Sequence, residues 1–203
     1  MTIRYICIMR RKIYREDILD AGFELMFLNG YHSTGIKEIT DTVGIPKGSF
    51  YNHFNSKESF AIEVLQRYCD NGLRVHKETL LENENIGPVE RLKKMYDEFI
   101  EHYNENDYKR GCFMGNFAQE LGDVNENFRE VLDLEFEKIE NVIAECLGQA
   151  KASSEINPNT NTEILAPFVL NSWHGAMIRM KATHSRKPLD EFYSLVFDSL
   201  LSS

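Results

Sequence analysis

The stretch from Gly30 to Glu58 constrains the fold of this chain more than any other part of its sequence. It reads GYHSTGIKEITDTVGIPKGSFYNHFNSKE and contains two short helical patterns on either side of Gly44. Apolar side chains recur at helical spacing in the first pattern, which Thr34 is expected to N-cap. Pro46 opens the second at a position where a missing N–H costs little. Two short helices joined by a Gly turn predict a helix-turn-helix.

The rest of the chain also reads as helices, and no strand-like alternation is present. We therefore predict an all-α fold of about nine helices. Residues 1–57 are expected to form an N-terminal tail and a three-helix helix-turn-helix domain. Residues 58–203 are expected to form a helical ligand-sensing and dimerisation domain. Beyond the helix-turn-helix, the predicted helices run over about 56–81, 88–104, 110–121, 125–149, 160–183 and 189–201.

The charge is unevenly distributed along the chain. Residues 1–57 hold eight basic and six acidic residues, and the remainder holds 15 basic and 26 acidic ones, for a formal net charge of −9. A slightly basic head on an acidic body is typical of a protein that presents only its head to phosphates.

The four cysteines are Cys7, Cys69, Cys112 and Cys146, with no CxxC pair and no histidine at metal-ligand spacing. No zinc site, other metal site or cofactor is therefore expected. With no secretion signal, the thiols are expected to be reduced and the protein cytoplasmic. The apolar run at the N-terminus is too short for a membrane span, and no membrane partner is expected. Met9 is followed by a basic stretch of the kind that often precedes a DNA-binding head. Translation is therefore expected to start at Met1 or at Met9.

The second short helix carries the residue types that a DNA-recognition helix needs. Gly48 permits a close approach to the sugar-phosphate chain, and longer side chains around it offer donors to phosphates and base edges. Phe50 and Phe54 are four apart and are expected to face the core. The candidate DNA-binding residues are Thr34, Lys47, Gly48, Ser49, Tyr51, Asn52, His53 and Lys57.

This stretch resembles the DNA-binding head of the TetR family of bacterial one-component regulators. The family pattern is a Thr, an isoleucine-rich helix, a Gly turn, and then Lys-Gly-small-aromatic-Tyr-x-His-Phe-x-x-Lys-Glu. The matching residues are Thr34, Ile36, Ile39, Gly44, Lys47, Gly48, Ser49, Phe50, Tyr51, His53, Phe54, Lys57 and Glu58. Gly35 stands where Ser or Thr is common and Pro46 where Ser is common, and each departure removes one phosphate donor.

The resemblance implies partners as well as a fold. It implies a homodimer formed through the last two long helices, at about 160–183 and 189–201. Such a dimer binds a palindromic double-stranded DNA operator, with its recognition helices about 35 Å apart. The resemblance also favours repression, with release by a small-molecule or electrophile inducer.

Two segments of the body are candidates for the sensor. Cys112 follows Arg110 and Gly111 near the start of a predicted helix, and both the helix N-terminus and Arg110 are expected to lower the pKa of its thiol. The segment SWHGAMIRMK, residues 172–181, ends at Lys181. Both segments resemble a TetR subgroup that includes the electrophile-responsive repressor of N-ethylmaleimide reductase and acrylate-responsive regulators. That resemblance implies that Cys112 and Lys181 are the sensing pair.

The alternative for Cys112 is an inert core thiol, which is the commoner state of an isolated cysteine. Cys69 and Cys146 have apolar neighbours and are expected in the core, and His174 is expected to be an ordinary helix residue. A pocket with apolar walls is what ligand sites use. Its candidate lining residues are Trp173, Met177, Phe113, Phe117, Phe99, Tyr103 and Phe168.

The sequence therefore predicts a DNA-binding transcriptional repressor that a small ligand or a thiol-reactive electrophile releases. The alternative is a repressor of an efflux or catabolic gene that senses a ligand non-covalently, with Cys112 purely structural. An adaptor without DNA binding is disfavoured by the intact set of Lys47, Tyr51, His53 and Lys57. An enzyme is disfavoured because no nucleophile–base signature appears.

Overall fold

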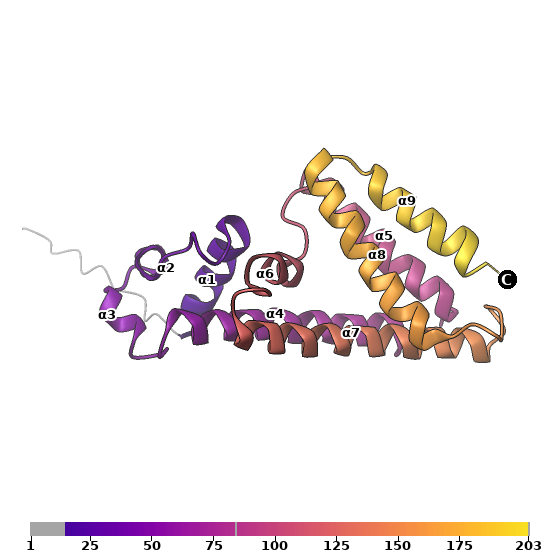
Figure 1. Ribbon diagram of the computed structural model, residues 1–203, viewed down its shortest axis with the longest axis horizontal. Coiled ribbons are helices and arrows are strands. Elements are labelled where there is room, and N and C mark those ends of the chain that lie inside the picture. The colour runs from indigo at the N-terminus through magenta and orange to yellow at the C-terminus, as the bar shows by residue number, and fades with distance from the viewer. Residues whose placement is uncertain (1–14, 84, 203) are drawn as a thin grey trace, which may run out of the picture. The chain divides into compact units, whose positions relative to one another are not determined.

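The computed structural model describes residues 15–83 and 85–202, and these residues form helices and their connections (Figure 1). The all-α prediction of about nine helices is confirmed for these ranges, whereas the start at Met1 or Met9 lies outside them. The helices are α1 (Arg15–Asn29), α2 (Ile36–Val43), α3 (Lys47–Phe50), α4 (Lys57–Leu80), α5 (Pro88–Glu105), α6 (Phe113–Leu121), α7 (Glu126–Ala152), α8 (Thr162–Thr183) and α9 (Lys187–Leu195), followed by a π-helical segment, η1 (Val196–Leu200).

The structure divides into two compact units at a point inside α4. The first unit ends at Val64 and the second begins at Leu65. The first unit therefore contains α1, α2, α3 and the start of α4, and the second contains the rest of α4 and all later helices. None of the helices in the described ranges is long and apolar enough to cross a bilayer.

An aromatic cluster forms the core of the first unit. The ring centroids of Phe50 lie 5.1 Å from those of both Phe54 and Phe60, and Phe54 and Phe60 are 4.7 Å apart. All three rings are buried, and the guanidinium of Arg15 lies 4.6 Å from the centroid of Phe54. A helix of four residues such as α3 is unstable in isolation. Burial of these rings therefore holds α3 in place.

Local signals at the helix ends of the first unit follow the sequence. Gly44 ends α2 with φ of 75°, a left-handed conformation that favours glycine. Ser56 and Ser59 cap the start of α4 reciprocally, since each backbone N–H donates to the other's hydroxyl at 3.0 and 3.1 Å. Ser56 and Ser59 together thus form the cap of α4.

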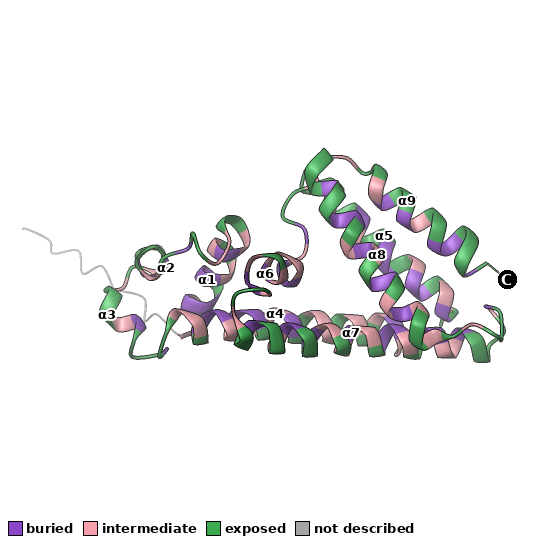
Figure 2. Ribbon diagram, in the orientation of Figure 1, coloured by how far each residue is buried: buried purple, intermediate pink, exposed green. Residues whose placement is uncertain are grey.

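In the second unit, α8 packs against both α7 and α9, and α5 and α6 also pack on α7. Tyr96 of α5, Trp173 of α8 and Phe192 of α9 form an aromatic group with centroids 4.9–5.1 Å apart. Figure 2 shows the buried residues of α8 and α9 alternating with exposed ones along each helix. Each of these helices therefore buries one face and exposes another.

One helix begins later than the sequence predicted. The prediction started α6 near residue 110, whereas the helix begins at Phe113. Arg110 and Gly111 have φ of 68° and 72°, which a right-handed helix cannot contain. The sequence offered no signal for the left-handed conformation at Arg110.

Replacing Gly22 with alanine is expected to destabilise the protein by about 1–3 kcal/mol. The added Cβ would lie 2.2 Å from Cζ of Phe60 and would displace a ring of the aromatic cluster. The matched control is Gly148→Ala in α7, where a Cβ meets no atom within 4 Å and helix propensity favours alanine by up to about 1 kcal/mol. Chemical denaturation measures the free energy of unfolding of both variants. An unchanged free energy of unfolding in Gly22→Ala would contradict the packing of Phe60 against Gly22.

Candidate functional site

The exposed side of α3 carries most of the predicted recognition residues. The α3 helix continues into hydrogen-bonded turns, in which the N–H of Asn52 donates to the carbonyl of Ser49 and that of His53 to Phe50. Tyr51 is 52 % exposed, and a Cβ at Gly48 would meet no atom within 4 Å. Lys47, Gly48, Tyr51, Asn52 and His53 are exposed, and Ser49 is half-buried.

Thr34 does not have the position that the sequence predicted. Gly35, with φ of −95°, is the N-cap of α2. Thr34 is fully buried, and its hydroxyl donates to the carbonyl of Gly30 at 2.8 Å. The prediction that Thr34 caps this helix is wrong, because its hydroxyl folds back onto the preceding turn and so does not reach a phosphate in this conformation.

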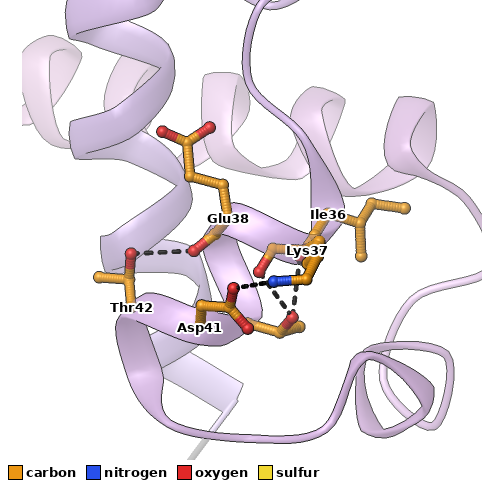
Figure 3. Close-up of polar contacts among 6 residues, drawn as sticks. Ile36, Lys37, Glu38, Asp41 and Thr42 are labelled. Carbon is orange, nitrogen blue, oxygen red and sulfur yellow. Dashed lines mark hydrogen bonds and ion pairs between the residues drawn. The ribbon is translucent and has the colours of Figure 1, made fainter.

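The polar side chains of α2 pair within that helix (Figure 3). The ammonium of Lys37 pairs with the carboxylate of Asp41 one turn later, and the hydroxyl of Thr42 donates to the carbonyl of Glu38 at 2.9 Å. The buried hydroxyl of Thr40 donates to the carbonyl of Ile36. Lys37, Asp41, Thr40 and Thr42 thus have partners within α2.

Lys57 lies at the start of α4 and contacts the turn that precedes α2. Its ammonium donates to the carbonyl of Tyr31 at 2.6 Å and to that of His32 at 3.4 Å. It also lies 4.3 Å from the centroid of the Tyr31 ring, a cation–π distance. Lys57 therefore ties this turn to α4, and a phosphate contact would have to compete with those bonds.

Two cavities of the second unit meet at Cys112. The larger has a volume of about 360 Å³, and its lining includes Cys112 and Asn116 from α6 and its N-cap, Glu140 from α7, and Lys181 from α8. The smaller, of about 110 Å³, has five aromatic lining residues, Tyr68, Tyr96, Phe99, Tyr103 and Trp173. Cys112, His174 and Met177 line both cavities. His174 is thus a cavity residue as well as a residue bonded to its own helix.

The position of Cys112 explains the pKa of its thiol. Cys112 is the N-cap of α6, with φ of −97°. Burial raises the pKa of the thiol, and this effect outweighs the lowering by the backbone N–H groups of Gly115 and Met114, the hydroxyl of Tyr68 and the charge of Lys181. The predicted helix N-terminus effect is therefore present, but the predicted net lowering is wrong.

Lys181 lies against the Cys112 segment although it is far from it in sequence. Its ammonium donates to Oδ1 of Asn116 at 2.9 Å, and its Cδ would lie 2.8 Å from a Cβ at Gly111. Both Cys112 and Lys181 line the larger cavity. The fold thus brings together the two residues that the sequence singled out.

Seven aromatic or sulfur residues are predicted to line a pocket, and the structure divides them. Phe99 and Tyr103 line the smaller cavity, whereas Phe168 lines neither cavity. Trp173 and Met177 line the smaller cavity, and the sulfur of Met177 accepts a hydrogen bond from the hydroxyl of Tyr103 at 3.0 Å. Phe113 and Phe117 line neither cavity. Their rings are fully buried, and the ring centroids lie 4.5 Å apart with the planes tilted by 48°, so both are core residues. Cys69 and Cys146 are buried, as predicted.

Asn116 and Tyr68 are site residues that sequence reasoning missed. Asn116 lies in the same segment as Cys112. The glycine before it, Gly115, is the one sequence feature that could have indicated a cavity wall at this position. Tyr68 is on α4, and no sequence spacing relates it to Cys112. Its role depends on packing within the second unit.

A strained turn precedes Cys112. Asp107, Tyr108 and Arg110 have φ between 53° and 68°, and Gly111 follows at 72°. Each non-glycine residue in this region costs about 1–2 kcal/mol. The amide nitrogen of Asn116 donates to the carbonyl of Arg110 at 3.0 Å and so helps to hold the turn.

The chain matches two family models. The model described as bacterial regulatory proteins, tetR family, matches residues 18–64, and the model described as tetracyclin repressor-like, C-terminal domain, matches residues 88–196. The first match covers α2 and α3 with the recognition residues. The second covers the cavities and most of their lining.

Individual relatives agree with these models. The transcriptional repressor DhaR of Mycobacterium sp. (strain GP1) is 34 % identical and covers 96 % of each chain. The transcriptional repressor NemR of Escherichia coli K12 is 25 % identical over 87 % of this chain and 88 % of its own. The crystal structure of a regulatory protein TetR from Rhodobacter sphaeroides has a TM-score of 0.81 at 28 % identity, covering 90 % of this chain and 95 % of its own.

The chain therefore belongs to the TetR family of bacterial transcriptional regulators. Its helix-turn-helix unit is a DNA-binding unit, and its relatives are regulators, not enzymes.

The alkylation rate of Cys112 is expected to rise about tenfold per pH unit from about pH 7 to about pH 8.5, because its thiol stays mostly protonated below a raised pKa. Tyr68→Phe should slow the reaction at each pH, since it removes a hydrogen bond that lowers the pKa. Tyr193→Phe, on α9, is the control. Mass spectrometry of iodoacetamide-treated protein measures the alkylation rate at each cysteine. A Cys112 rate that already reaches its plateau below about pH 7 would contradict the dominance of burial.

Lys57→Met and Lys47→Met are expected to weaken DNA binding in different ways. Lys47 is exposed, so its loss should lower the slope of log affinity against log salt by about 1. Lys57→Met should leave the slope unchanged and lower the free energy of unfolding by about 1 kcal/mol, because its ammonium bonds the turn at Tyr31. Titration of DNA at several salt concentrations separates the two. A salt slope reduced by Lys57→Met would assign that ammonium to a phosphate.

Proposed function

We propose that this regulator is a repressor that binds a palindromic operator as a homodimer and is released when a small molecule or a thiol-reactive electrophile enters the cavity at Cys112. The observation that carries this proposal is the position of Cys112 and Lys181 on the wall of one cavity of about 360 Å³. Cavities of this size accept small ligands.

In this proposal the DNA-binding part spans residues 1–57, and the sensing and dimerisation part spans residues 58–203. The contacts to DNA come from Lys47, Gly48, Ser49, Tyr51, Asn52 and His53. Lys57 positions the turn beside them or contacts a phosphate. Exposure of Lys47, Gly48, Tyr51, Asn52 and His53 supports the assignment.

Exposed apolar side chains on the last helices support the homodimer. Ile164, Phe168 and Ile178 lie on one face of α8 and are 46–68 % exposed. Leu195 of α9 is 53 % exposed. Large apolar side chains gathered on a surface mark interaction sites. We infer that α8 and α9 of one protomer pack against the same helices of its partner.

The electrophile proposal depends on the groups around the thiol. The N–H groups of Gly115 and Met114, the hydroxyl of Tyr68 and the charge of Lys181 all favour the thiolate, which is the form that attacks an electrophile. Tyr68 lies on α4, which also carries Lys57.

A second candidate is a repressor that senses its ligand non-covalently, with Cys112 as a structural thiol. The raised pKa of Cys112 favours it, because a protonated thiol is a poor nucleophile. The lining of the larger cavity is compatible with both candidate functions.

Treatment with N-ethylmaleimide separates the two candidates. Electrophile sensing predicts that the reagent weakens operator binding by at least about tenfold for the wild type but not for Cys112→Ser, which should bind the operator normally before treatment. Cys146→Ser is the control, because Cys146 is buried and lines neither cavity. Fluorescence anisotropy measures binding. Equal release of Cys112→Ser would assign release to another group.

Phe168→Asp is expected to convert the dimer to monomers and to abolish operator binding, because it places a charge on the exposed apolar face of α8. Val124→Asp is the control, since Val124 is 71 % exposed in the turn between α6 and α7. Sedimentation velocity measures the oligomeric state. A Phe168→Asp protein that remains dimeric would place the interface elsewhere.

A further inference from the structure

Asn116 joins the wall of the larger cavity to the strained turn before Cys112. Its side-chain carbonyl accepts a hydrogen bond from the ammonium of Lys181 at 2.9 Å. Its side-chain N–H₂ donates to the backbone carbonyl of Arg110 at 3.0 Å. One amide therefore connects a cavity lysine of α8 to the backbone of the connection between α5 and α6.

The turn depends on its surroundings for its conformation. Asp107, Tyr108 and Arg110 have left-handed φ without being glycine, and such residues persist only where neighbouring groups hold them. Within the turn, the N–H of Tyr108 donates to the carbonyl of Tyr103 at 2.8 Å, and that of Gly111 to Lys109 at 2.9 Å. These two bonds form only while the turn keeps its shape.

Lys181 also touches the turn directly. Its Cδ would lie 2.8 Å from a Cβ at Gly111, so its aliphatic part covers that glycine. If the ammonium moved to another acceptor, both the cover over Gly111 and the bond to Asn116 would be lost together. The larger cavity is where such an acceptor would lie, because Gly111, Asn116 and Lys181 all line it.

We propose that Asn116 is a latch that couples occupancy of this cavity to the order of the turn at residues 107–111. A ligand oxygen that accepts from Lys181 removes the partner of the Asn116 carbonyl, and Asn116 then releases Arg110. The ligand oxygen is uncharged, as in a carbonyl compound, because Asp133 and Glu140 make the rest of the lining acidic. This inference rests on the proposed function only in taking the cavity as the ligand site.

Amide hydrogen exchange of the full chain, without DNA or ligand, tests the latch. Lys181→Met and Asn116→Ala each remove one end of the connection and should speed exchange at Tyr108 and Gly111 by about three- to tenfold. The double variant should exchange no faster than the faster single variant, because both changes break the same connection. Asn141→Ala is the control, since Asn141 is exposed on α7 and lies outside the cavity.

Two results would overturn the latch. One is wild-type exchange at Tyr108 and Gly111 in Lys181→Met, a change at an exposed side chain that leaves the core intact. The other is a multiplicative increase in the double variant, which would mean that the two residues act independently. Because neither DNA nor a ligand is present, either result leaves the proposed release from the operator untouched.

Discussion

The buried cluster of Phe50, Phe54 and Phe60 is the constraint on which the DNA-binding unit depends. A helix as short as α3 has no stability of its own, so its orientation is set by the rings that it buries. With Phe50 and Phe54 facing inward, the residues between them face outward. Tyr51, Asn52 and His53, which follow α3, are therefore exposed, and the cluster fixes which side chains face outward.

In the second unit, opposing effects act on one thiol. Cys112 receives hydrogen bonds from a helix N-terminus and from Tyr68, and it lies near the charge of Lys181, yet burial keeps its pKa raised. A thiol in this state is protonated at rest and has the groups around it that stabilise a thiolate once one forms. The same cavity wall holds a strained turn through Asn116. The side chain of Asn116 thus contacts both Lys181 at the cavity and the backbone of the turn.

The sequence predicted what depends on local patterns and missed what depends on packing. The helix-turn-helix was predictable because apolar spacing, Gly44 and Pro46 act over a few residues. Thr34 was misplaced because a threonine hydroxyl can cap the next helix or bond the preceding turn, and only the structure shows which. The late start of α6 depends on the φ of Arg110, and the parts played by Tyr68 and Asn116 depend on neighbours distant in sequence. Phe113 and Phe117 were assigned to a pocket because an aromatic residue in a core and one in a cavity wall look alike in sequence.

The arrangement of the outward face of α3 in a two-fold dimer is tested most directly by selecting bound sequences from a random pool of duplex DNA. The wild-type chain is predicted to enrich an inverted repeat whose half-sites are centred about 10 base pairs apart, and Tyr51→Ala is predicted to enrich none. Two results would contradict this account. One is enrichment of a single, unrepeated site by the wild type, and the other is enrichment of the same inverted repeat by Tyr51→Ala.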